Sequence, residues 1–158
     1  MNPRRAEDRD AQDLFGLLTL CFADYPGCLT DPHDDLRDLR RPGTSFRGAG
    51  EAFLVVADET GRVCACIAVD RPEPGLGELH RLYVRPDRRG QGLAAGLVAA
   101  AEAVARAAGA TRMRLWSDTR FTDAHRLYAR LGYRPDGGRR ALGDVSNSTE
   151  QGFARALD

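Results

Sequence analysis

The spacing of apolar residues predicts helices near the start of the chain. Within residues 10–22 four apolar side chains recur at the helical repeat, namely Leu14, Leu17, Leu18 and Cys21. A Pro-Gly pair follows soon after, so we expect the first helix to end there. A shorter second helix is expected within residues 31–41, before the Pro-Gly pair at 42–43, because Asp31 can cap it and Pro32 suits its first turn.

Runs of β-branched and alternating apolar residues predict strands. Residues 52–70 contain two such runs around a Glu-Thr-Gly turn, a pattern that is typical of an antiparallel hairpin. A third strand is expected at 77–84 and a fourth at 111–117. Two closing strands are expected at 133–142 and 150–157.

The central part of the chain predicts a strand–helix–strand unit. One apolar helical stripe follows the third strand and comprises Leu93, Leu97, Ala101, Val104 and Ala108. Gly109 suits the left-handed cap of this helix. Since a helix separates the third and fourth strands, they should be parallel and joined by a right-handed crossover. Another helix is expected over residues 121–131, ending at Gly132.

Length and charge narrow the class of protein. The 158 residues fit one domain that spans 1–158. Twenty-three Lys and Arg residues balance twenty-three Asp and Glu residues, which removes the bulk electrostatic argument for a nucleic acid or a membrane as partner. The opening residues lack the apolar segment of a secretory signal, and no apolar run approaches the ~20 residues of a membrane span. We therefore expect a soluble, cytoplasmic protein.

The four cysteines, Cys21, Cys28, Cys64 and Cys66, show no repeated C-x-x-C pattern. We expect them to be reduced thiols, since a chain of this length has no evident need of disulfides. Cys64 and Cys66 would project from the same face of a strand, where a metal pair is conceivable. Two buried small hydrophobes are the favoured interpretation, so no metal site is expected.

A glycine loop follows the third expected strand. Gly90, Gly92 and Ala95 fit the G-x-G-x-x-A spacing of a dinucleotide site. A Rossmann turn would place its first glycine directly after the strand, whereas five residues separate that strand from Gly90 here. The loop suits an anion better, because glycine N–H groups run into a helix N-terminus and Arg88 and Arg89 add mobile positive charge.

The stretch from Arg89 to Ala94 resembles the pyrophosphate loop of the GCN5-related N-acetyltransferase (GNAT) family, which reads Arg/Gln-x-x-Gly-x-Gly/Ala. The stretches ELHRLYV before it and DAHRLYARLGY after it are also similar to that family, and the resemblance covers residues 51–133 well. It implies an α/β (mixed α+β) GNAT fold with a mostly antiparallel twisted sheet of six to seven strands, helices on both faces and a splayed central strand pair. It also implies acetyl-CoA as cosubstrate, held in the gap.

The resemblance assigns residues to the cofactor. The pantetheine arm would pair with the backbone of Leu82, Tyr83 and Val84. The pyrophosphate would lie against the loop, whose implied binding residues are Arg88, Arg89, Gly90, Gln91, Gly92, Leu93 and Ala94. In such direct transfer the enzyme supplies no nucleophile, and backbone amides can hold the tetrahedral oxyanion.

Three residues are candidates for proton transfer. Tyr128 matches the proton donor of the family and would protonate the departing CoA thiolate, with core packing as its alternative role. An acceptor ammonium of pKa ~10.4 must lose a proton before it attacks. Glu78 matches the glutamate base of histone-type members, and His80 is its rival. Strict alternation would place one set of side chains on a single strand face: Glu78, His80, Leu82 and Val84.

Two functions from different classes follow. The leading one is an N-acetyltransferase that moves an acetyl group from acetyl-CoA to an amine of a small molecule or peptide by direct attack; a homodimer is possible. The alternative is a non-catalytic acyl-CoA-binding or sensing domain. Asp31, Asp34 and Asp35 could attract a cationic amine, although a solvated helix cap is the preferred interpretation of this cluster.

Overall fold

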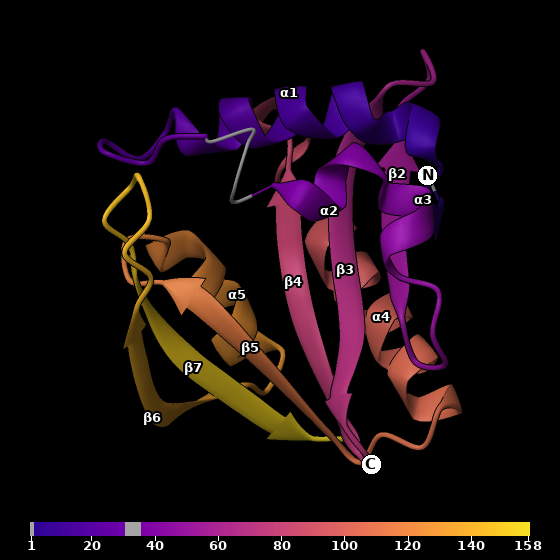
Figure 1. Cartoon of the computed structure of the whole chain (residues 1–158), viewed down its shortest axis with the longest axis vertical. Helices are drawn as coiled ribbons and strands as arrows, with labels where there is room; N and C mark the ends of the chain where they lie inside the picture. The colour runs from indigo at the N-terminus through magenta and orange to yellow at the C-terminus, as the bar shows by residue number, and fades with distance from the viewer. Residues whose placement is uncertain (1, 31–35) are drawn as a thin grey trace.

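A seven-stranded sheet forms the centre of the protein, and the computed structural model describes residues 2–30 and 36–158 (Figure 1). The strands run in the order β1-β2-β3-β4-β5-β7-β6. Neighbouring strands are antiparallel except β4 and β5, which are parallel. The strands are β1 (Arg4–Arg5), β2 (Ala52–Ala57), β3 (Val63–Glu73), β4 (Leu76–Val84), β5 (Arg112–Asp118), β6 (Arg134–Ala141) and β7 (Thr149–Ala156).

Helices cover both faces of this sheet. They are α1 (Ala11–Phe22), α2 (Arg37–Arg40), α3 (Pro42–Ser45), α4 (Leu93–Ala107) and α5 (Thr122–Arg130), with 3-10 turns at Asp8–Asp10 and Pro86–Arg88. The apolar side chains of α1 and α2 form one buried cluster with the sheet, and those of α4 and α5 join a second cluster on the other face. The expected mixed fold, mostly antiparallel with helices on both faces, is confirmed.

The central strand pair splays apart. β4 and β5 are paired in register only from Leu76 opposite Arg112 to Leu79 opposite Leu115. Beyond Leu79 the backbone of β4 has β3 on one side and no strand partner on the other among the described residues. Figure 1 shows the two strands diverging toward the side that carries α1. The predicted opening in the sheet is therefore present.

A β-bulge interrupts β4 at this opening. Arg81 has a φ of 56°, and the register with β3 shifts between Tyr83 opposite Cys66 and His80 opposite Ala68. The extra residue breaks strict alternation. Leu79, Leu82 and Val84 all belong to the core on the α4 side, whereas Tyr83 packs on the α1 side. The expectation that Leu82 and Val84 share a face with Glu78 and His80 is wrong for this reason.

A second bulge corrects the prediction for the cysteine pair. The register of β2 with β3 shifts between Val56 and Ala57. Cys64 is consequently buried in the cluster on the α4 side and Cys66 in the cluster on the α1 side. The two thiols do not share a strand face, although both are buried as expected.

The second predicted helix differs from the structure. Asp31 and Pro32, its expected start, lie outside the described residues. Two one-turn helices, α2 and α3, occupy residues 37–45, and Pro42 begins the second of them instead of ending the first. A proline suits the first turn of a helix, because its missing N–H would have no partner there. In the described part of the chain, no helix has the length and apolar character to cross a bilayer.

Candidate active site

Two cavities flank the opening between β4 and β5. The larger, of about 590 Å³, is lined by the end of α1, the end of β4, the glycine loop and α5; we term it the loop cavity. The smaller, of about 360 Å³, is lined by the middle of β4 and β5 and by the segment between β6 and β7; we term it the acidic cavity. Both are bordered by Phe22, Leu82, Tyr83, Phe121 and Ala124. The cavities therefore meet where the sheet opens.

The glycine loop has the backbone that an anion cradle requires. Gly90 and Gly92 have φ values of 74° and 79°, in the left-handed region that glycine adopts without strain. Gly92 is the N-cap of α4, whose first N–H groups have no partner within the helix. No atom lies within 4 Å of the position that a Cβ would take at either glycine. A ligand can thus approach the backbone directly.

The loop arginines are held by carboxylates. Arg89 Nη1 lies 2.8 Å from Asp24 Oδ2, and its Nε donates to the Val84 carbonyl at 3.2 Å. Arg88 pairs with Glu59 and, at 3.7 Å, with Asp87. Both guanidiniums therefore have carboxylate partners, with which a bound anion would compete.

The end of β4 forms one wall of the loop cavity. Leu82, Tyr83 and Val84 all line it, opposite residues of α5 such as Leu127. Because β5 has already diverged, this stretch of backbone faces the cavity without a strand on that side among the described residues. An extended ligand can pair there as an added strand would.

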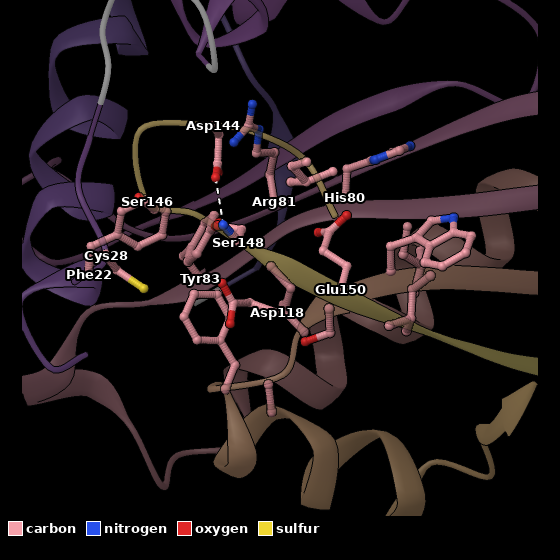
Figure 2. A pocket seen from close by; sticks show the side chains of 18 of the residues that line it. Phe22, Cys28, His80, Arg81, Tyr83, Asp118, Asp144, Ser146, Ser148 and Glu150 are labelled. Atoms are coloured by element: carbon pink, nitrogen blue, oxygen red, sulfur yellow. Dashed lines mark hydrogen bonds between the residues drawn. The ribbon is translucent and has the colours of Figure 1, made fainter. Parts of the chain in front are cut away.

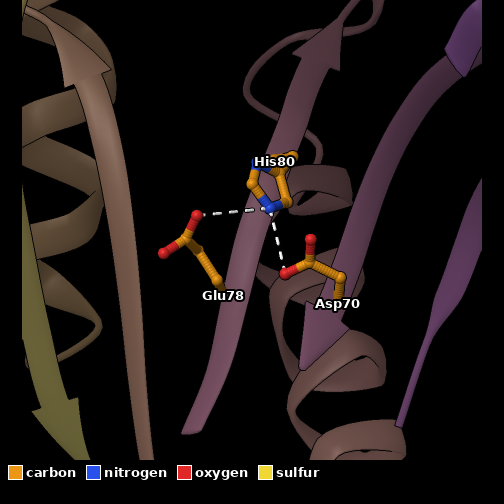
Figure 3. Close-up of side chains that lie close together, drawn as sticks. All are labelled: Asp70, Glu78 and His80. Atoms are coloured by element: carbon orange, nitrogen blue, oxygen red, sulfur yellow. Dashed lines mark ion pairs between the residues drawn. The ribbon is translucent and has the colours of Figure 1, made fainter. Parts of the chain in front are cut away.

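Asp70, Glu78 and His80 form a cluster on β3 and β4 (Figure 3). His80 Nε2 lies 3.2 Å from Asp70 Oδ1 and 3.5 Å from Glu78 Oε1. The cross-strand register, with Asp70 opposite Glu78, produces this contact. Asp70 and His80 line the acidic cavity, whereas Glu78 contacts His80 behind them. The structure thus brings the two candidate bases together and adds Asp70, which sequence reasoning missed.

The cluster also has the donor types of a cation site. One donor atom from each of Asp70, Glu78 and His80 lies within 4.8 Å of the other two. Asp70 Oδ1 and His80 Nε2 are shielded from solvent and have no partner with hydrogen-bond geometry. Imidazole and carboxylate can ligate a metal such as zinc, so these three residues could hold one. The same arrangement suits an ammonium group that donates protons.

Tyr128 projects from α5 toward the opening. It is buried, lines the acidic cavity and packs against the rings of Tyr133 and Phe153, at 6.1 and 5.8 Å between centroids. Burial raises the pKa of Tyr128 above its ordinary value, and the neighbouring Tyr83 adds to the rise. Its hydroxyl therefore stays protonated at neutral pH, as a proton donor requires. The core contacts show that it also has the packing role.

Tyr83 is a second phenol at the opening. It borders both cavities and packs against Phe22 with 5.8 Å between ring centroids. Burial raises the pKa of Tyr83, while the charge and hydrogen bonding of Arg81 act to lower it. Sequence reasoning assigned only the backbone of this residue, because strict alternation did not reveal where its side chain points.

The acidic cavity contains matched ion pairs. Arg81 pairs with Asp38 at 2.9 Å, and Arg140 pairs with Glu150 at 2.7 Å. Beside the cavity, Arg120 pairs with the buried Asp118 at 2.6 Å. These pairs join elements far apart in sequence, so no local pattern predicted them.

Asp144 lies in the segment between β6 and β7 and faces the same cavity (Figure 2). Its Oδ1 accepts the Ser148 N–H at 2.7 Å. Ser146 holds this segment against residues 28–30, because its Oγ accepts the Leu29 N–H at 2.8 Å and donates to the Leu29 carbonyl at 3.1 Å. This segment, Cys28 and Leu29 thus form one wall of the cavity. The carboxylates Asp31, Asp34 and Asp35, considered above as a possible attraction for a cationic amine, lie outside the described residues.

Comparison with known proteins agrees with this geometry. The sequence profile of the Acetyltransferase (GNAT) family matches residues 12–133. A GNAT acetyltransferase from Staphylococcus aureus has the same fold, with a TM-score of 0.82, 15% identity and 99% of each chain covered. An acetyltransferase from Salmonella typhimurium, solved with its cofactor acetyl-CoA, has a TM-score of 0.75, 19% identity, and covers 100% of this chain and 94% of its own.

Curated relatives share parts of the sequence. The mycothiol acetyltransferase of Beutenbergia cavernae is 32% identical over 117 residues, which are 72% of this chain and 38% of that protein. The aminoalkylphosphonate N-acetyltransferase of Salmonella typhimurium is 44% identical over 59 residues, which are 37% of this chain and 38% of that protein. The matches therefore span less than two thirds of either relative.

Proposed function

The chain belongs to the GNAT family of acetyltransferases, and from this premise we propose that it is an acyl-CoA-dependent N-acetyltransferase that moves an acetyl group from acetyl-CoA to an amine. The observation that carries the proposal is the junction of the two cavities. One has an anion cradle and the other a base cluster, and Tyr83 borders both. A donor and an acceptor can therefore meet at the opening.

The loop cavity would hold acetyl-CoA. The first N–H groups of α4 and the left-handed glycines Gly90 and Gly92 suit the pyrophosphate, assisted by the helix dipole. The unpaired edge of β4 from Leu82 to Val84 suits the amide groups of pantetheine. Two structural neighbours were solved with acetyl-CoA or CoA, which supports acetyl-CoA as the cosubstrate. When the pyrophosphate binds, Arg89 would exchange its contact with Asp24 for a phosphate oxygen.

The acidic cavity would hold the amine. An ammonium of pKa ~10.4 is protonated at neutral pH, so a group in the cavity must accept a proton before nitrogen can attack. Glu78 is the proposed base, acting directly or through water, and His80 is its rival. If His80 accepts the proton, the Glu78 carboxylate at 3.5 Å would stabilise the imidazolium that forms.

The acetyl transfer then needs no covalent enzyme intermediate. The amine nitrogen attacks the thioester carbonyl, a C–N bond forms, and the oxyanion collapses as the C–S bond breaks. The departing thiolate takes a proton from Tyr128, the proposed general acid. Since a thiol of pKa ~8.5 is already a fair leaving group, this proton accelerates the reaction without being indispensable.

Thiol release tests the proposal against the non-catalytic alternative. The purified chain is mixed with acetyl-CoA and a panel of amines, and free CoA is measured with a thiol reagent. Mixtures without amine correct for hydrolysis of the thioester. An enzyme releases CoA in proportion to an acetylated amine, whereas an acyl-CoA-binding domain binds the cosubstrate and releases none. The latter result across the panel would contradict the proposal.

A further inference from the structure

The acidic cavity has an excess of negative charge. Among the described residues that line it are five carboxylates, Asp38, Asp70, Asp118, Asp144 and Glu150, against the guanidiniums of Arg81 and Arg140. Arg120 lies next to the cavity through its pair with Asp118. The chain as a whole is formally neutral, so this excess is a local property of the cavity.

The guanidiniums at this cavity already have carboxylate partners. Arg81 approaches Asp38 through two nitrogens, at 2.9 and 3.1 Å. Arg140 approaches Glu150 at 2.7 and 2.8 Å. A carboxylate or phosphonate on the acceptor would have to separate one of these pairs. The Arg81–Asp38 pair is mostly buried, and breaking it would leave a carboxylate without compensation, so an anionic acceptor is disfavoured beside Arg81.

Arg120 cannot serve an anion either. It contacts both oxygens of Asp118, at 2.6 and 2.9 Å, and its Nη2 also donates to Ser148 Oγ at 3.2 Å. The hydrogen bond with Asp118 raises the pKa of Arg120, and the charge of Asp144 adds to the rise. Arg120 is therefore engaged by Asp118, and no ion pair joins it to Asp144 among the described residues.

Two carboxylates remain without a guanidinium. Among the described residues, no Arg side chain comes within 4.0 Å of Asp144, whose Oδ1 is bonded to the Ser148 N–H. Within residues 2–30 and 36–158, the imidazole of His80 is the one ion-pair partner of Asp70. Asp70 lies on β3 beside the proposed base, and Asp144 lies in the segment between β6 and β7. They are therefore separate attachment points for positive charge.

The indole ring of Trp116 in this cavity is already occupied by cations. Arg114 and Arg140 each place a guanidinium 4.3 Å from the ring centroid of Trp116. A substrate ammonium cannot stack on this ring without displacing one of them. The carboxylates therefore attract a substrate cation more readily than this ring does.

From these contacts we infer that the acceptor is an amine that carries a second cationic group and no acid group, such as an aliphatic diamine. The inference rests on the proposed acetyltransferase function. The reacting ammonium lies beside Asp70, Glu78 and His80, and the second cation lies near Asp144. The relative named for aminoalkylphosphonates would differ from this chain in the charge of its acceptor.

A series of acceptors with equal chain length isolates the charge. The purified chain is assayed for thiol release with 1,4-diaminobutane, butylamine, 4-aminobutanoate and 3-aminopropylphosphonate, in an amine-free buffer at neutral pH. All four present a primary amine that is protonated at this pH. We expect kcat/KM to be highest for the diamine, lower for butylamine and lowest for the two anions.

Variants locate the second cation. Asp144→Asn keeps an oxygen for the Ser148 N–H and should lower kcat/KM for the diamine by about three- to tenfold, the range for one partly exposed charge contact. It should leave butylamine unchanged. Glu73→Gln is the matched control, since Glu73 lies at the far end of β3 and lines neither cavity among the described residues. An equal loss for both amines would contradict the assignment of Asp144.

Two outcomes separate this inference from the function on which it rests. If 4-aminobutanoate or 3-aminopropylphosphonate is acetylated at or above the rate of the diamine, the inference of a cationic acceptor is overturned, while the proposed acetyltransferase function stands. If no amine is turned over, calorimetric titration of the CoA-bound protein with 1,4-diaminobutane decides. If the diamine then binds more tightly than 4-aminobutanoate, the preference of the cavity for a cationic acceptor is supported, although the proposed acetyltransferase activity is contradicted. If the diamine does not bind, the inference of a cationic acceptor is overturned as well.

Discussion

A side chain at Gly92 should separate the fold from cofactor binding. Gly92 has a φ of 79° and no atom beyond its chain neighbours within 4 Å of its Cβ position, so the β-carbon of a substituted side chain has open space there. The remaining penalty is the left-handed backbone, roughly 1–2 kcal/mol for a non-glycine residue. A typical domain has about 5–15 kcal/mol of stability, so Gly92→Val should fold.

Cofactor binding should suffer much more. The valine side chain would occupy the space through which a phosphate reaches the first N–H groups of α4. Loss of one hydrogen bond to a charged group costs roughly 1.5–3 kcal/mol, so the Kd for CoA should rise by about ten- to a hundredfold. Calorimetric titration with CoA measures this change, and denaturant unfolding measures the stability.

The opposite end of the same helix supplies the control. Gly109 has a φ of 87° and also has no atom within 4 Å of its Cβ position. Gly109→Val should therefore lose a similar amount of stability and keep its affinity for CoA. Equal CoA affinities in the two variants would refute the reasoning, because the loop at Gly92 would then lie outside the binding site.

Three further outcomes are expected. Tyr128→Phe should keep CoA affinity and slow turnover, and a rate equal to that of the parent would leave Tyr128 with core packing alone. Glu78→Gln and His80→Gln, each assayed for turnover against pH, should identify the base: if only His80→Gln loses the rate and the acidic limb of the profile, Glu78 is not the base. Burial acts to raise the pKa of Asp10, but its hydrogen bonds with Arg4 and the Glu7 backbone and the charges of Arg4 and Arg9 together outweigh burial, and the pKa is lowered. The interactions of Asp10 therefore stabilise the fold at pH values above the ordinary carboxyl pKa, and this stabilisation is lost as pH falls through the lowered pKa. Asp10→Asn should reduce the free energy of unfolding by roughly 1–3 kcal/mol at neutral pH and by less near pH 2. Denaturant unfolding of parent and variant at both pH values measures the difference.

Local signals predicted the cofactor side of the site. The glycines at 90 and 92 predicted a loop, and the apolar stripe from Leu93 predicted a helix directly after it; the structure has both, with left-handed backbone at the two glycines. Gly109 adopts the left-handed conformation expected at the end of that helix. Each of these features depends on residues within a few positions of one another, so one sequence was sufficient to predict them.

The acceptor side depends on contacts between distant segments. The pairing of Asp70 with His80 follows from the register of β3 with β4, which the bulge at Arg81 alters. Asp144 reaches the cavity because Ser146 attaches its segment to Leu29, 117 positions away in the chain. Periodicity within a strand or a loop has no access to such contacts. The charge of this cavity therefore could not be predicted from the sequence.

The bulge on β4 adds one residue just beyond the point where β4 and β5 part. Arg81 and Leu82 together lie opposite Ile67, since the positions on either side are matched as His80 with Ala68 and Tyr83 with Cys66. Deleting one of the two residues at the bulge would restore a regular ladder, and Tyr83 would keep its face. The extra residue therefore lengthens the strand at the opening and leaves the phenol of Tyr83 on the same side of the sheet.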